Sequence, residues 1–567
     1  MRLLSLSLCG SYKGLKDQFF DFSYAQDNVV ALIGLNGSGK SQLLELIGET
    51  FAYLERWQRE EFKTKTSLGF GLTVHYQWDL RHDNDALLYP DMLITRDGIV
   101  ELKVTIELNG DVVLSIRNAD EWHTLEAGEH HFPIPVVVGY ASGLNENLQR
   151  SFMKNAVQYF EVRRISSQRH KRLSREINDE QLAEINTNYL KKYPYIFSPL
   201  SEGDFVPNYH QDLREVNPTS SNFNYLDYDN VGLLILSLSI LPTETVFQLL
   251  DEITYKHPVK AVLHYDFRSG IIEDDAIRDV KMLIRIAGSD QVRPTGGRTT
   301  DNQYELYELE YLSGEITLEL SDEAVLNRLR EDNYYDSFAL FKRLNNVQQL
   351  GIKNWARTSR LKLMADDFIG TVKKPLQSRL PLSVVELLMA NEQGDTVRFD
   401  DLSDGEAQLI QVIAATRIFS QAQALFLFDE PETHLNPSWR TYFHQRLTEA
   451  FTPENEREGQ SQFFLSTHSP FMISSLKREN VFFFERSDMG CISMEPVSSQ
   501  TYGTSFDILV KNHYGLRSLI SQTVVEDVKN RLPEDNDPEA VIVARRWIEE
   551  SLGESMEKAY LLRKLEN

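Results

Sequence analysis

Apolar positions along the chain group into runs that predict buried strands joined to helices. The clearest case begins at residues 29–33, where an apolar, β-branched run predicts a buried strand. A glycine-rich turn follows, and residues 41–47 then have the spacing of a helix. Further along, a helix is predicted over 409–420, a strand buried on both faces over 424–428, and another strand over 462–465. This order of elements predicts an α/β fold.

Short strand patterns also fill the rest of the N-terminal region. They lie at residues 3–8, 19–22, 71–78, 101–108, 112–117 and 134–140. Asn109 and Gly110 separate two of these strands, and this dipeptide is a strong signal for a two-residue type I′ hairpin turn. We therefore expect an antiparallel, hairpin-rich lobe beside the sheet that contains residues 29–33.

Residues 147–380 have a mixed, mostly helical character. Helical patterns cover 147–162, 179–192, 228–241, 243–255, 322–330 and 336–350, and strand-like runs cover 261–267, 304–311 and 314–319. Prolines and glycines predict a flexible loop at 288–301, and no heptad pattern lasts long enough for a coiled-coil arm. We therefore divide the chain into segments 1–146, 147–380 and 381–520 and a helical tail at 521–567.

Composition restricts the class of protein. The chain has 567 residues, 41% of them hydrophobic and 25% charged, as in globular proteins that are soluble in water. No apolar run is long enough for a membrane span, and the first residues predict a strand rather than a signal peptide. Cys9 and Cys491 are the only cysteines, so we expect no disulfide framework and no thiolate metal site. A cytoplasmic location is the default expectation.

Charge bears on the choice of partner. The net charge of −25 argues against a protein that coats nucleic acid without sequence preference. One dense basic run stands out in this acidic chain: Arg163, Arg164, Arg169, His170, Lys171, Arg172 and Arg175. It is either a contact for nucleic acid or an acidic partner, or a solvated helix face with local salt bridges, and we favour the second interpretation.

The glycine-rich turn has the pattern G-x-x-x-x-G-K-S from Gly34 to Ser41. Its glycines let backbone N–H groups approach phosphate oxygens, and the following helix adds the positive end of its dipole. Lys40 is a charge for the β- and γ-phosphates, and the Ser41 hydroxyl can ligate Mg²⁺. We therefore expect ATP and Mg²⁺ as cofactors. The residues assigned to nucleotide binding in this turn are Asn36, Gly37, Ser38, Gly39, Lys40, Ser41 and Gln42.

Three further groups carry chemistry in the second half of the chain. Ser403 and Gly405 precede a long apolar helix, whose N-terminus can hold an anion. Asp429 and Glu430 follow the strand at 424–428, at the end where α/β sheets place ligands. Asp429 would hold Mg²⁺ together with Ser41, and Glu430 would polarise the attacking water. His468, at the end of the strand at 462–465, would contact the γ-phosphate.

Taken in series, the motifs at 34–41, 402–406 and 427–430, together with His468, resemble those of the ATP-binding cassette (ABC) ATPases. They are most similar to the branch that contains the SMC, DNA-repair and prokaryotic defence ATPases. The stretches 429–435 and 502–509 resemble the defence branch, which includes the overcoming-lysogenization-defect ATPases and PtuA of the Septu systems, some of them associated with retrons. The resemblance covers about 1–150 and 380–520.

The resemblance implies an ABC-type ATPase head. It would consist of a mixed sheet with the phosphate loop, plus an antiparallel β lobe, and would carry residues 147–380 as a mostly helical insert. Segments 1–146 and 381–520 would be the two halves of the head. Heads would face each other in a homodimer or higher oligomer, with ATP between the phosphate loop of one protomer and Ser403 and Gly405 of the other.

The chain departs from the family pattern L-S-G-G-Q at two positions. Asp404 replaces a glycine and Glu406 replaces the glutamine. A carboxylate close to phosphate is unfavourable unless it points away. Lys13 matches a basic position that reaches the nucleotide in this branch. The glutamine that completes the metal shell is either Gln77 or Gln149, and the choice stays open.

Three functions are compatible with these motifs. The first is a Mg²⁺-dependent ATPase that controls a partner nuclease of the HNH type in anti-phage defence. The alternative is a DNA-repair or DNA-binding ATPase of the RecF or SMC kind, and DNA or the RNA–DNA of a retron is a further candidate partner. A transporter subunit is disfavoured, because the insert does not resemble a coupling domain. The residues after 516 are too few for a nuclease domain in the same chain.

Overall fold

The computed structural model describes most of the chain. The described residues are 1–62, 67–82, 98–118, 121–125, 131–142, 146–173, 175, 178–201, 213–216, 221–268, 273–372, 380–420, 422–451, 461–515, 520–533 and 538–566. They form two compact units, Met1–Gly503 and Thr504–Asn567. Within these residues, no helix combines the length and the apolar character that a membrane crossing requires.

A seven-stranded, mostly parallel sheet lies at the centre of the first unit. Its strands, in spatial order, are β11 (Phe223–Tyr225), β8 (Val136–Ala141), β17 (Ala424–Asp429), β18 (Gln462–Ser466), β3 (Val29–Gly34), β19 (Val481–Arg486) and β20 (Ile492–Pro496). Only β20 runs antiparallel to its neighbour. Because β17, β18 and β3 are parallel neighbours, the residues after each of them emerge at the same edge. The predicted α/β class is confirmed.

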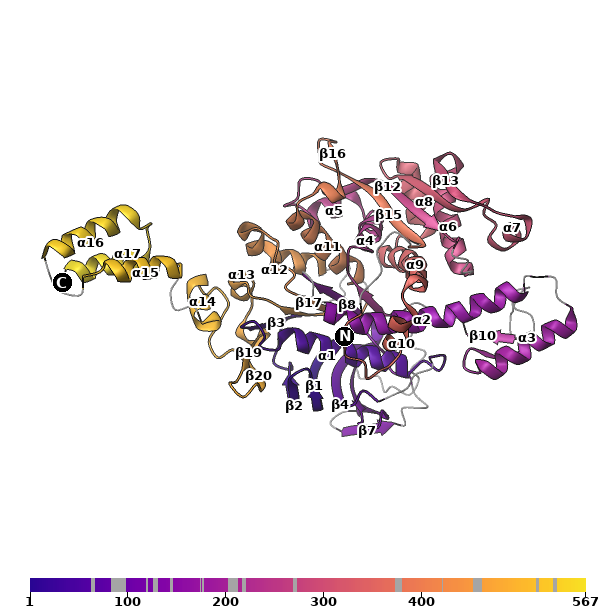
Figure 1. The fold of residues 1–567 in the computed structure, drawn as a ribbon, viewed down its shortest axis with the longest axis horizontal. Helices are drawn as coiled ribbons and strands as arrows, with labels where there is room; N and C mark the ends of the chain where they lie inside the picture. The colour runs from indigo at the N-terminus through magenta and orange to yellow at the C-terminus, as the bar shows by residue number, and fades with distance from the viewer. Residues whose placement is uncertain are drawn as a thin grey trace. The chain divides into compact units, whose positions relative to one another are not determined.

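A second, antiparallel sheet has the order β2, β1, β4, β5, β6, β7. The strands are β1 (Arg2–Tyr12), β2 (Leu15–Asp21), β4 (Gly71–Asp79), β5 (Ile99–Ile106), β6 (Val112–Asn118) and β7 (Glu121–Leu125). Helix α1 (Lys40–Trp57) contacts strands of both sheets (Figure 1). It shares one hydrophobic core with them through residues such as Leu43, Leu46 and Phe51. This sheet is the expected antiparallel lobe.

The turn between β5 and β6 differs from the prediction. Glu107 and Asp111 bond through their backbones, so the loop has three residues, and Gly110 has φ 92 while Asn109 does not have a positive φ. A type I′ turn needs positive φ at both central residues, whereas a three-residue loop needs it only at its last position. The dipeptide thus predicted the hairpin correctly and the turn type incorrectly.

The remaining elements of the first unit pack around these sheets. The helices are α2 (Glu146–Leu173), α3 (Asp179–Lys192), α4 (Val231–Leu238), α5 (Thr243–Leu249), α6 (Asp274–Ala287), α7 (Asp301–Tyr307), α8 (Glu323–Asp332), α9 (Ser337–Gln349), α10 (Arg357–Leu363), α11 (Asp404–Phe419), α12 (Pro437–Phe451) and α13 (Pro470–Ser474). A five-stranded sheet has the order β13 (Val292–Arg298), β14 (Tyr311–Glu319), β12 (His257–Asp266), β15 (Leu382–Ala390), β16 (Thr396–Arg398). A short pair, β9 (Phe197–Pro199) and β10 (Leu213–Glu215), lies near α3.

Two local predictions in this region are wrong. The first half of the expected strand at 304–311 lies in helix α7, because Thr300 and Gln303 form a capping box that starts a helix there. The expected loop at 288–301 contains strand β13, which tolerates Pro294 and two glycines because it lies at the edge of its sheet and has a bulge.

The basic run up to Arg172 lies on the C-terminal half of α2 and makes local salt bridges, and Arg175 follows the helix. The Arg164 guanidinium lies 2.6 Å from a Glu161 oxygen, and His170 Nε2 lies 3.1 Å from Glu215 Oε2. Arg163 and Arg169 are buried rather than solvated. Part of the run therefore contributes to packing around α2, whereas Arg172 and Arg175 are exposed.

The second unit, Thr504–Asn567, is described only as helices. They are α14 (Phe506–Tyr514), α15 (Gln522–Arg531), α16 (Pro538–Ser551) and α17 (Met556–Glu566). Helix α16 begins at Pro538, because proline is favoured in the first turn of a helix, and it ends before Gly553. Val528, Ala544 and Ile548 are buried, and the Arg531 guanidinium lies over the Trp547 ring.

Candidate nucleotide-binding site

The turn from β3 to α1 has a backbone that requires glycine at two positions. Gly34 and Gly39 have φ values of 140 and 116. A Cβ on Gly34 would lie 2.3 Å from the Phe484 carbonyl oxygen, and one on Gly39 would lie 2.7 Å from a methyl carbon of Ile492. Strand β19 and strand β20 thus press against this turn from one side. Ile492 is a contact that sequence reasoning missed, since it lies far along the chain.

Lys40 is the first residue of α1 and is 5% exposed. Its ammonium donates to the carbonyls of Gly34 (3.0 Å) and Leu35 (3.2 Å) and lies 3.1 Å from His468 Nε2. Burial lowers the pKa of Lys40, while the carboxylates of Glu430 and Asp429 act in the opposite direction. A partly desolvated cation thus lies at the strand–helix junction, close to the acids after β17.

Two oxygen ligands expected to hold a metal are in direct contact. Ser41 Oγ donates to Asp429 Oδ1 over 3.0 Å, and Ser466 Oγ donates to the same oxygen. Hydroxyl and carboxylate oxygens are the donors that Mg²⁺ prefers. The pair comes from residues 388 positions apart in the chain, brought together by the parallel order of β3, β18 and β17.

Glu430 and His468 face each other beside this pair. Glu430 has φ 53, a left-handed conformation that is costly for a non-glycine residue and that clusters at functional sites. Its backbone N–H donates to the Ser466 carbonyl, and its carboxylate lies 3.5 Å from His468 Nε2. Burial and the Lys40 charge lower the pKa of His468. The structure therefore brings Lys40, Ser41, Asp429, Glu430 and His468 into one cluster.

The rest of the phosphate turn fits an anionic ligand. Asn36 and Gly37 are exposed, and a Cβ on Gly37 would meet no atom within 4 Å. Ser38 Oγ is buried and has no hydrogen-bond partner among the described residues. An unpaired buried hydroxyl is uncommon in proteins, and this one is free to donate to the oxygen of a bound anion. Gln42 lies in the first turn of α1 and is half-buried.

Ser403 is the N-cap of α11 and forms a capping box with Glu406. Ser403 Oγ donates to Glu406 Oε2 over 2.7 Å, and the Ser403 N–H donates to the same oxygen. The replacement of glutamine by Glu406 thus places the carboxylate on its own helix cap. A Cβ on Gly405 would lie 2.9 Å from the His434 carbonyl oxygen, so Gly405 allows α11 to approach the turn after β17. Asp404 is exposed.

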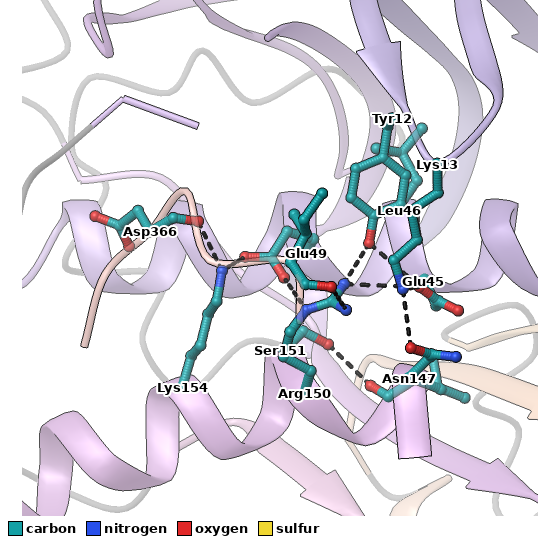
Figure 2. A network of polar contacts seen from close by, with 12 residues as sticks. Tyr12, Lys13, Glu45, Leu46, Glu49, Asn147, Arg150, Ser151, Lys154 and Asp366 are labelled. Atoms are coloured by element: carbon teal, nitrogen blue, oxygen red, sulfur yellow. Dashed lines mark hydrogen bonds and ion pairs between the residues drawn. The ribbon is translucent and has the colours of Figure 1, made fainter. Parts of the chain in front are cut away.

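The structure places Lys13 against α1 and α2 (Figure 2). Its ammonium donates to Glu45 Oε2 over 2.7 Å and to Asn147 Oδ1 over 3.0 Å. Burial lowers the pKa of Lys13, while Glu45 acts in the opposite direction. The contacts that hold Lys13 are therefore those of a polar network, and its role toward a nucleotide stays a prediction.

Both candidate glutamines for the metal shell have partners elsewhere. Gln77 lies on β4 and donates to Glu101 over 3.1 Å. Gln149 lies on α2, donates to Asp227 over 2.9 Å, and lines a cavity of about 100 Å³ that also contacts Phe152. The assignment of this glutamine remains open.

Two buried polar residues near the cluster were missed from the sequence. Gln408 on α11 donates to Tyr140 Oη (2.9 Å) and accepts from the His434 N–H (3.0 Å), so it joins β8 to the turn after β17. Glu432 is buried in that turn, and burial raises its pKa to about 7. The only sequence signal for Glu432 was its place as a third acid in the run Asp-Glu-Pro-Glu.

These features form a candidate nucleotide-binding site at the carboxyl edge of a parallel sheet. Residues 290–474 match the family model described as "AAA domain, putative AbiEii toxin, Type IV TA system". The matched residues include Ser403, Asp429, Glu430 and His468.

Solved structures of SMC heads are also similar to this chain. The SmcHead bound to the C-winged helix domain of ScpA has a TM-score of 0.31 and 11% identity over 88% of this chain and 98% of that chain. The Smc head domain of Pyrococcus yayanosii with a coiled coil and joint has a TM-score of 0.29 and 15% identity. The match covers 90% of this chain and 99% of that chain. The SMC head domain from Thermotoga maritima has a TM-score of 0.27 and 12% identity. The match covers 88% of this chain and 100% of that chain.

Proposed function

We propose that this protein is a Mg²⁺-dependent ATPase whose heads assemble and which controls a partner nuclease in anti-phage defence. The observation that carries the ATPase part is the convergence of Lys40, the Ser41–Asp429 pair and Glu430 at one sheet edge. Ser41 and Asp429 would hold Mg²⁺, which neutralises charge on the β- and γ-phosphates when bound. Lys40 would bind phosphate oxygens, and the Glu430 carboxylate would accept a proton from the attacking water.

The cap of α11 supports assembly through the heads. Ser403 and Asp404 are exposed at a helix N-terminus, where backbone N–H groups and the helix dipole favour an anion. The Glu406 carboxylate bonds to the Ser403 cap, which reduces the objection that this acid would repel a phosphate. We therefore propose that Ser403 and Gly405 contact the ATP held by a second copy of the chain.

The partner is proposed from sequence. The stretches 429–435 and 502–509 resemble the defence branch, in which PtuA-like ATPases work with a separate HNH nuclease. A DNA-repair function would predict a strong basic channel, but the net charge is −25, and Arg163, Arg164 and Arg169 of α2 are salt-bridged or buried. Co-purification from a host that carries the neighbouring genes tests the choice. An HNH nuclease in the eluate supports the proposal, whereas salt-sensitive DNA binding by the isolated protein supports repair.

Glu430→Gln should bind ATP and fail to hydrolyse it. Loss of the general base is expected to lower kcat by about 10²–10⁴-fold, because the amide cannot accept the proton. Phosphate release and light scattering on a gel-filtration column measure the rate and the ATP-dependent dimer, which should be stabilised. Glu184→Gln, on the exposed face of α3, is the matched control. Hydrolysis at the wild-type rate by Glu430→Gln would show that this role is wrongly assigned.

A further inference from the structure

Glu432 is a buried acid for which the mechanism above has no use. It lies two residues after Glu430 and is 4% exposed. Its Oε1 accepts a hydrogen bond from Thr467 Oγ1, whereas its Oε2 is buried without a hydrogen-bond partner among the described residues. Burial raises its pKa to about 7, and the charge of Glu430 acts in the same direction.

Thr467 ties this acid to the loop that carries His468. It is fully buried, its backbone N–H donates to the Leu32 carbonyl of β3, and its Oγ1 accepts from the Ser469 N–H over 2.9 Å. The hydrogen bond between Glu432 and Thr467 therefore joins two loops that follow adjacent parallel strands, β17 and β18. One loop presents Glu430 and the other presents His468.

A purely structural role for Glu432 would cost free energy in the folded state. A buried carboxyl loses its hydration, and an unpaired buried oxygen adds a further cost. An apolar side chain of similar volume often fills such a position at equal or lower free energy. The presence of an acid here is explained if the Thr467 hydrogen bond serves the geometry of the site.

We propose that Glu432 is a positioning residue for ATP hydrolysis, which through Thr467 fixes the His468 loop against the turn that presents Glu430. This inference rests on the proposed ATPase function and adds a residue to it. The bond sets the register in which His468 Nε2 lies 3.1 Å from Lys40 Nζ and 3.5 Å from Glu430 Oε1. Without it the two loops keep their strands and the contact between Ser466 and Asp429, but lose the buried hydrogen bond that fixes one loop against the other.

Glu432→Leu and Glu432→Gln separate positioning from packing. Leucine keeps most of the volume and removes the acceptor, so kcat should fall by about 10²-fold, the cost of a misplacement of about 1 Å. The KM for ATP, the affinity for a fluorescent ATP analogue and the melting temperature should stay close to wild type. Glutamine keeps an amide oxygen that can accept from Thr467, and its kcat should return close to that of wild type.

Thr467→Val provides the second arm of the test, because it removes the other partner of the same hydrogen bond. It should lower kcat as Glu432→Leu does, and the double variant should be no worse than either single variant, as a shared interaction requires. This arm keeps the proposal testable if Glu432→Leu does not fold.

Specific results would overturn the inference. The first is a wild-type kcat in Glu432→Leu or, if that variant does not fold, in Thr467→Val. The second is a loss of kcat in Glu432→Gln equal to that in Glu432→Leu. The third is a double variant in which the effects of Glu432→Leu and Thr467→Val add. A wild-type protein that binds ATP without hydrolysing it would overturn the proposed function and this inference together. An active wild type with an unaffected Glu432→Leu would overturn the inference alone.

Discussion

Lys40→Ala should abolish ATP binding. The ammonium is held at the strand–helix junction by the Gly34 and Leu35 carbonyls, and it is the cation of the phosphate turn. A hydrogen bond to a charged group contributes about 1.5–3 kcal/mol, so loss of contacts to two phosphates should weaken binding by at least about 10²-fold. Titration calorimetry or a fluorescent ATP analogue measures this loss.

The loss should not be caused by unfolding. Because burial lowers the pKa of Lys40, the charge is costly to the folded state, and its removal should leave the melting temperature near that of wild type. The control is Lys191→Ala, which changes an exposed lysine at the end of α3. Wild-type affinity in Lys40→Ala would mean that the turn from Gly34 to Ser41 does not hold the nucleotide.

The second large effect is expected at Glu49, in the network between α1 and α2 (Figure 2). Glu49 is 1% exposed, and its carboxylate lies 2.6 Å from Lys154 Nζ, 3.4 Å from Arg56 Nη2 and 3.8 Å from Arg150 Nε. Lys154 also donates to the Asp366 carbonyl over 2.6 Å. Glu49→Ala leaves buried cations without their shared anion, which should destabilise the first unit by about 3–5 kcal/mol.

Urea unfolding measures this change, and two controls define it. Glu49→Gln removes the charge but keeps an acceptor for Lys154, so it should cost less than alanine. Glu550→Ala breaks an exposed pair with Arg546 in α16 and should change stability by less than about 1 kcal/mol. A Glu49→Ala protein as stable as wild type would show that the network is replaceable by packing.

The same network predicts how the stability of the first unit changes with pH. Burial acts to raise the pKa of Glu49, but Lys154, Arg56 and Arg150 together hold it below its usual value of 4.5. The stability from Glu49 is therefore present at neutral pH and is lost as the pH falls below 4.5, through the lowered pKa of the folded state. Glu49→Gln should remove this part of the acid sensitivity.

The strand–turn–helix at the start of the chain and the acids after β17 were predictable because each is a local pattern. Apolar runs indicate buried segments, and the glycines of the turn indicate backbone positions where a Cβ would clash with neighbouring atoms. The meeting of Ser41 with Asp429 follows from the parallel order of the strands, which the motif series implied through resemblance and which no local pattern contains.

What the sequence did not reveal depends on partners from distant segments. The carboxylate of Glu406 could face a phosphate or its own helix cap, and only the fold selects the cap. Lys13 has a position that suited a nucleotide, yet Glu45 and Asn147 hold its ammonium. The tyrosines at 304–311 favour a strand by composition, whereas the capping box at Thr300 starts a helix.

The order of strands in the central sheet has a consequence for synthesis on the ribosome. Strand β3 leaves the ribosome early, but its two neighbours, β18 and β19, begin at Gln462 and Val481. At about 5–20 residues per second, β3 waits on the order of tens of seconds for either partner. The turn from Gly34 to Ser41 is therefore among the last parts of the nascent chain to acquire its final shape, and a ribosome stalled before residue 462 carries a chain in which β3 has neither of its two neighbours.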